Sequence, residues 1–134
     1  DALPIWLSSS ARIREMLPND VLVLPAHEAP FYGLHVRLSQ LIESHNRDLR
    51  GLFDYLDQPR RAVDCFPPLF SREIGPNSLG LATGETLAHL NCLLGRRRIS
   101  RRRDEQGVNW YQQRPETAGF EDEPEAAARS PRAS

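Results

Sequence analysis

The sequence of 134 residues contains no lysine, no long apolar run and only two cysteines. No apolar stretch approaches the ~20 residues of a membrane-spanning helix, so a membrane protein is not indicated. Cys65 and Cys92 lack C-x-x-C spacing, and each falls in a helical pattern where a free cysteine behaves as a small apolar side chain. A reduced pair is therefore favoured over a disulfide, and we expect a cytoplasmic protein.

Arginine supplies all 17 basic residues, which we attribute to genomic base composition rather than to function. The formal net charge of −1 conceals an uneven distribution, because six arginines lie within residues 96–103 and five acidic residues lie in the last twenty residues. Beyond residue 113 the sequence is dominated by Pro, Glu, Ala and Ser, a composition typical of disorder. The basic cluster lies just before it and comprises Arg96, Arg97, Arg98, Arg101, Arg102 and Arg103.

Hydrophobic periodicity predicts a mainly α protein with a small β part. Helices are expected over residues 4–16, 34–56, 60–66 and 78–94, with Gly95 as the C′ residue of the last one. Val21–Leu24 has the continuous apolar pattern of a strand buried on both faces, although the sequence offers it no partner strand of that kind. A hairpin should follow residue 95, with "DEQG" as its turn. Helices followed by a hairpin are the winged-helix order.

Two segments together resemble the C-terminal half of metallo-β-lactamase-fold hydrolases. They are "VLVLPAHEAPFYGLHVRLSQLIESHNRDL" and "LATGETLAHLNCLLGRRRISRRRDEQGVNWY". The resemblance implies a C-terminal fragment of an αββα metallo-β-lactamase fold followed by a winged-helix-like domain. Residues 1–33 would be the remnant of the αββα core, residues 34–112 the long helix and winged-helix-like domain, and residues 113–134 a disordered tail. The chain begins at Asp1, which we interpret as a processed protein or a piece of a longer one.

The resemblance also implies a site. In this family the histidine at the end of such a strand is the last ligand of a two-metal centre, usually zinc, and His27 falls on that position. The family's H-x-H-x-D-H motif is absent from the sequence. The intact parent would then be a metal-dependent hydrolase of a small ester, thioester or lactone. This chain alone should be inactive and should not bind zinc tightly, because a zinc site takes three or four protein ligands.

Other residues near or outside this site have alternative interpretations. The family commonly has glycine after the metal-binding histidine, whereas this chain has Glu28, which would either approach a metal or point to solvent. Phe31, Tyr32 and His35 would line the mouth of a substrate cleft or simply pack at a helix start. His45 lies on the apolar seam of the long helix, and His89 lies beside leucines in the third helix, so both are predicted to be structural.

A second class of function is a winged-helix binding module that contacts nucleic acid or a protein partner. The arginine cluster over residues 96–103 would contact phosphates in a salt-dependent manner. The third helix, which would enter a DNA groove, contains no arginine and few long polar side chains, so base readout is not expected. We therefore favour the hydrolase and do not expect nucleic-acid binding; homodimerisation stays open.

Overall fold

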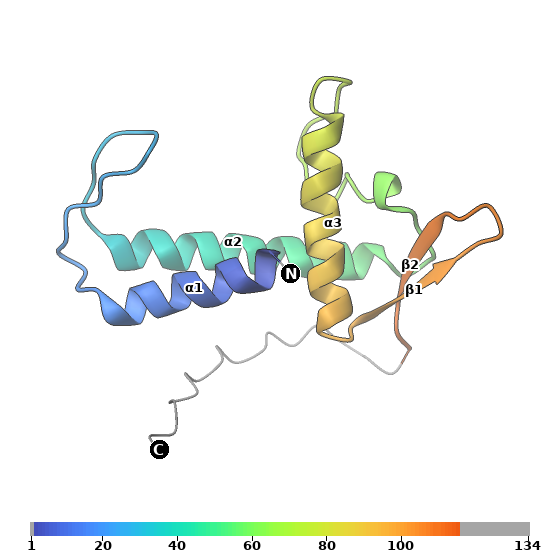
Figure 1. Ribbon diagram of the computed structural model, residues 1–134, viewed down its shortest axis with the longest axis horizontal. Helices are drawn as coiled ribbons and strands as arrows, with labels where there is room; N and C mark the ends of the chain where they lie inside the picture. Colours follow the sequence, from blue (N-terminus) through green and yellow to red (C-terminus); the bar gives the residue numbers. More distant parts are fainter. Residues whose placement is uncertain (1, 116–134) are drawn as a thin grey trace, which may run out of the picture.

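The computed structural model describes residues 2–115, and the segment predicted to be a disordered tail lies outside this range from residue 116 onward. Three helices and one β-hairpin make up the described part (Figure 1). None of these helices is both long enough and apolar enough to cross a membrane. In chain order the elements are α1 (Ala2–Met16), α2 (Leu34–Tyr55), the 3-10 turn η1 (Ala62–Asp64), α3 (Leu79–Gly95), β1 (Ile99–Arg103) and β2 (Asn109–Gln113).

The long helix α2 is the axis of the molecule, with α1 alongside it and α3 crossing it (Figure 1). Its apolar residues recur every three or four positions, as predicted, and those in its C-terminal half are buried. They join residues of α1, α3 and both strands in one hydrophobic core. The largest fully buried aliphatic side chains are Leu49, Leu52, Leu56, Leu90 and Leu93.

The hairpin is formed as predicted and is held at its turn by one carboxylate. Strands β1 and β2 pair antiparallel with Arg101 opposite Tyr111. At the turn, Gly107 adopts a φ of +84°, a conformation that glycine tolerates without strain. The Asp104 side chain accepts hydrogen bonds from the backbone N–H of Val108 and the indole N–H of Trp110, both at 2.8 Å.

Residues that follow α2 attach the hairpin to the core. Arg60 and Tyr111 form an isolated antiparallel bridge, with N–O distances of 2.9 and 2.8 Å. Gln113 donates its backbone N–H to the carbonyl of Leu56 at 2.9 Å and its side-chain amide to the carbonyl of Phe53 at 2.6 Å. These bonds join β2 to carbonyls at the C-terminal end of α2; the carbonyl of Phe53 also accepts from the backbone N–H of Leu56 at 3.1 Å.

Two predicted elements differ from the structure. Val21–Leu24 is not a strand: only Val23 bridges to Phe31, while Leu22 and Leu24 are 52% and 73% exposed. The backbone finds no further pairing partner here among the described residues, so the apolar run stays extended without a sheet. The helix predicted over residues 60–66 contracts to η1, because Arg60 pairs with β2 before it and Pro67 follows it. The predicted boundary between an αββα remnant (residues 1–33) and a second domain (residues 34–112) stays a prediction.

The end of α3 also differs in detail from the prediction. The left-handed residue is Arg97, with φ of 57°, rather than Gly95, which is the last helical residue. Arg98 N–H donates to the carbonyl of Leu93, and Arg97 N–H donates to that of Leu94, both at 3.0 Å. This pair of bonds is a Schellman motif with a non-glycine C′ residue.

Replacing Arg97 with glycine should therefore stabilise the chain. A residue with a Cβ pays about 1–2 kcal/mol for left-handed backbone, and glycine avoids this at the cost of greater entropy when unfolded. We expect Arg97→Gly to raise the free energy of unfolding by about 0.5–1 kcal/mol in urea titrations. Arg97→Ala is the matched control, because it removes the same side chain but keeps the backbone strain. Equal stability of the two variants would contradict the prediction.

A second prediction concerns the buried thiol of Cys65. It is fully buried and donates to the carbonyl of Arg61 at 3.3 Å, and burial raises the pKa of the thiol to about 11 from 9.0. Between these values the unfolded chain loses a proton that the folded chain keeps. The stability contributed by the thiol is therefore present below pH 9 and is lost as the pH rises toward 11.

Urea unfolding of the wild type and of Cys65→Ala checks this prediction. The difference in unfolding free energy between the two proteins should shrink by about 2–3 kcal/mol between about pH 8 and pH 11, because each pKa unit corresponds to about 1.36 kcal/mol. The alanine variant corrects for other groups that titrate in this range. A difference that stays constant with pH would show that the thiolate is not disfavoured by folding.

Candidate functional site

His27 lies in a loop that a short β-bridge closes. Val23 and Phe31 exchange backbone hydrogen bonds of 2.8 and 3.1 Å, and residues 24–30 form the loop between them. His27 is exposed, as is Glu28. Glu28 has a φ of 75°, in the left-handed region that favours glycine. An exposed imidazole on a closed loop is available to a ligand.

His35 fastens this loop region to the start of α2. Its Nε2 lies 2.7 Å from the carbonyl oxygen of Leu17, and because a carbonyl can only accept, Nε2 is the donor. The backbone N–H of His35 donates to the side chain of Asn19 at 2.9 Å. Of the predicted cleft residues, Phe31 is half-buried and Tyr32 is exposed. The role of His35 in the structure is thus to join the turn after α1 to the first turn of α2.

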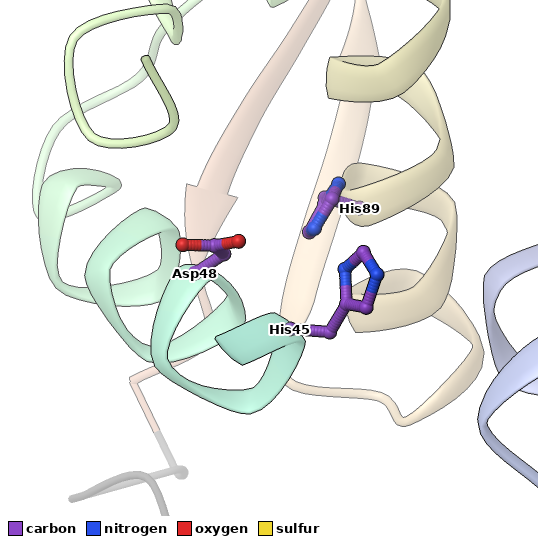
Figure 2. Close-up of side chains that lie close together, drawn as sticks. All are labelled: His45, Asp48 and His89. Carbon is purple, nitrogen blue, oxygen red and sulfur yellow. The ribbon is translucent and has the colours of Figure 1, made fainter. Parts of the chain in front are cut away.

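A second group of polar side chains lies where α3 crosses α2. His45 and Asp48 are three residues apart on α2 and therefore share one face of it. His89, on α3, points toward both of them (Figure 2). One potential ligand atom from each of the three side chains lies within 4.8 Å of the other two, and the two imidazole centroids are 5.6 Å apart. On the side of α1, the Trp6 ring contacts His45 edge-on, with a centroid distance of 4.8 Å.

The environment of this group favours neutral imidazole on His45. Burial lowers the pKa of His45 below its ordinary value of 6.5, and repulsion by His89 lowers it further. The carboxylates of Asp48 and Glu85 act in the opposite direction but do not reverse the shift. At neutral pH the His45 side chain is therefore uncharged, with one ring nitrogen carrying a lone pair.

Two buried ring nitrogens in this group have no hydrogen-bond partner within residues 2–115. They are Nδ1 of His45 and Nε2 of His89. The other nitrogen of His89, Nδ1, lies 2.9 Å from the carbonyl oxygen of Glu85 and so must carry the proton. Nε2 of His89 is then an acceptor with no donor. Leaving a buried polar group unpaired costs about 1–3 kcal/mol, so the arrangement needs an explanation.

Sequence reasoning predicted that both histidines are structural and did not connect them. The burial of His89, 2% exposed, agrees with that prediction, while His45 is half-buried. One signal was present: His45 and Asp48, three residues apart in a helical pattern, offer two ligand atoms on one face. The contribution of His89 was not predictable, because it depends on where α3 crosses α2. His27 does not join this group among the described residues.

Comparisons with known proteins agree with the resemblance seen in the sequence. Residues 49–114 match the family model described as metallo-beta-lactamase-like, C-terminal domain. A beta-lactamase domain protein from Burkholderia ambifaria is 32% identical, with a TM-score of 0.77 over 84% of this chain. A metallo-beta-lactamase family protein from Thermus thermophilus is 26% identical, with a TM-score of 0.67 over 84% of this chain.

The chain spans 33% of the length of each of these two structures. No curated protein matches the sequence. The family match covers the C-terminal third of α2, η1, α3 and the hairpin, which hold most of the residues of the hydrophobic core. Residues 49–114 are therefore similar to the metallo-β-lactamase-like C-terminal domain, and the structural neighbours of the chain are β-lactamase-fold proteins.

Proposed function

We propose that this chain is the C-terminal portion of a metal-dependent hydrolase of the metallo-β-lactamase superfamily, with an ester, thioester or lactone as its substrate. The observation that carries the proposal is the family match over residues 49–114, together with the structural similarity over 84% of the chain. The described residues supply a helical platform and one exposed histidine loop. The proposal assigns substrate hydrolysis to the whole protein and none to this chain alone.

His27 is the residue that we assign to the metal centre of the whole protein. Neutral imidazole is a good zinc ligand, and the exposed position of His27 leaves its ring accessible. A zinc ion in such a centre lowers the pKa of bound water and so supplies hydroxide near neutral pH. Within residues 2–115, no group of potential ligands includes His27, so this chain by itself does not fit a two-zinc centre. The remaining ligands would have to lie outside these residues.

The chain's own contribution is to hold the His27 loop in place. The Val23–Phe31 bridge closes the loop, and the hydrogen bonds of His35 to Leu17 and Asn19 join the segment before the loop to the first turn of α2. A ligand on a loop with fixed ends loses less conformational entropy when it binds a metal. This supports a positioning role for the segment that joins α1 to α2.

The test is a hydrolysis assay on the whole gene product that carries this chain. Zinc-loaded protein should hydrolyse at least one of three probes: p-nitrophenyl acetate, an acyl thioester or an acyl-homoserine lactone. His27→Ala should lower kcat/KM by at least about 100-fold, because loss of outer-shell partners alone costs about 10–100-fold at metal sites. Since His27 is exposed, the variant should keep its thermal stability.

Arg12→Ala is a suitable control, because it alters another exposed side chain on the preceding helix, α1. It should leave kcat/KM unchanged. Full activity of His27→Ala would contradict the assignment of this ligand, and absence of hydrolysis of all three probes by the zinc-loaded protein would contradict the proposed reaction. Hydrolysis by the 134-residue chain alone would contradict the proposal that it is inactive.

The binding-module alternative rests on the exposed arginines of β1, Arg101 to Arg103. Arg103 is already engaged, since its Nε donates to the carbonyl of Gly107 at 2.9 Å. The exposed face of α3 carries Leu81, which is 81% exposed, and Glu85 rather than basic residues. These features support the hydrolase over a nucleic-acid reader.

A further inference from the structure

The seam between α2 and α3 brings together three side chains of the types that bind transition metals. His45 and Asp48 come from α2 and His89 from α3, so the group joins two helices that are far apart in the sequence (Figure 2). The seam lies well along α2, whereas the His27 loop precedes the first turn of that helix (Figure 1). The ligand sets of the two places therefore share no residue.

The proton positions suit a metal. The carbonyl of Glu85 holds the proton of His89 on Nδ1, so that the lone pair on Nε2 faces the space between the three side chains. A carbonyl that accepts from the distal nitrogen is the usual outer-shell partner of a metal-binding histidine, because it fixes both the tautomer and the ring orientation. His89 is thus oriented as a ligand by a bond within its own helix.

The alternative interpretation is that the two histidines only fill the core. It explains why Trp6 packs on His45, but it leaves two buried ring nitrogens without partners within residues 2–115 and places a carboxylate beside them. Core histidines normally have their ring nitrogens satisfied. A cation between the three side chains would satisfy both nitrogens and the carboxylate at once.

We propose that His45, Asp48 and His89 bind one divalent transition-metal ion, with zinc as the best-suited metal. This is a different site from the centre that we assign to His27, and it revises the expectation from the sequence that this chain binds no zinc tightly. The ligand atoms would be Nδ1 of His45, Nε2 of His89 and a carboxylate oxygen of Asp48.

The ligand set and the spacing agree with this choice. Two imidazoles exclude Mg²⁺ and Ca²⁺ as the preferred ions, because these take oxygen ligands. With zinc–nitrogen bonds of about 2.0–2.1 Å, tetrahedral ligands stand about 3.3 Å apart. In the structure the three ligand atoms lie up to 4.8 Å apart, so they must approach one another by at most about 1.5 Å. Rotation of the side chains can supply this movement. Three protein ligands would leave the fourth tetrahedral position of zinc for a water molecule.

The consequence for the fold would be a clamp between α2 and α3. The leucine contacts of the core lie toward the C-terminal end of α2, and the metal would fasten the two helices one turn earlier. An ion that binds the folded chain and not the unfolded chain raises stability by mass action. Zinc should therefore raise the melting temperature of the chain and slow hydrogen exchange around residue 89.

The experiment is a calorimetric titration of the untagged 134-residue chain with zinc chloride, repeated with Co²⁺ to record its visible absorption spectrum. One zinc ion per chain should bind, and Co²⁺ should give the intense bands of tetrahedral nitrogen–oxygen coordination. Asp48→Asn and His45→Gln should each weaken zinc binding at least tenfold. An alanine variant of His89 could misfold, because this residue is buried. The test therefore uses His45 and Asp48, which are only half-buried.

Two matched controls complete the design. Asp54→Asn removes an exposed carboxylate from the same helix, and His27→Ala removes an exposed histidine; both should leave zinc affinity unchanged. Absence of stoichiometric zinc binding would overturn the proposal, as would binding that survives Asp48→Asn and His45→Gln. Loss of binding in His27→Ala would overturn it in favour of the other centre. The outcome is independent of the hydrolysis assay, which tests His27.

Discussion

The packing of α3 across α2 is the contact on which the rest of the structure depends. Five leucines are fully buried in one core. They are Leu49 and Leu52 of α2, Leu56 directly after α2, and Leu90 and Leu93 of α3. Burying a leucine side chain contributes about 1.5–3 kcal/mol, so this set contributes strongly to the apolar stabilisation. Helix α1 packs beside this pair, while η1 and the hairpin close its other end.

The same seam explains why a polar group lies next to the core. The apolar stripe of α2 passes through His45 before it reaches Leu49, and that of α3 passes through His89 beside Leu90. The packing of the leucines fixes the separation of the two helices, and this in turn brings the two imidazole rings close together. Burial then makes each ring nitrogen costly to leave unpaired and favours the neutral form of His45.

The loop that carries His27 depends on far less packing. One β-bridge and the bonds made by His35 hold it, and the large apolar side chains around it, Leu22, Leu24 and Tyr32, are exposed. A segment with few buried contacts has low local stability. Its geometry can adapt to a ligand or to a neighbouring surface more readily than the geometry of the helical seam.

Local pattern in the sequence by itself determined α2, α3 and the hairpin. Helix formation follows the spacing of leucines along the chain, and the hairpin turn follows from Asp104 and Gly107, which act within a few residues. None of these features requires knowledge of distant residues. The assignment of His27 to a metal centre rests on the family resemblance instead, and it stays a prediction.

Tertiary contacts decided the remainder. The run Val21–Leu24 did not become a strand, because pairing needs a partner that local pattern cannot supply. Residues 60–66 became a single 3-10 turn because Arg60 pairs with Tyr111. The meeting of His45 and Asp48 with His89 is the clearest case. The spacing along α2 places two of these side chains on one face, but only the crossing of the helices brings the third within 4.8 Å.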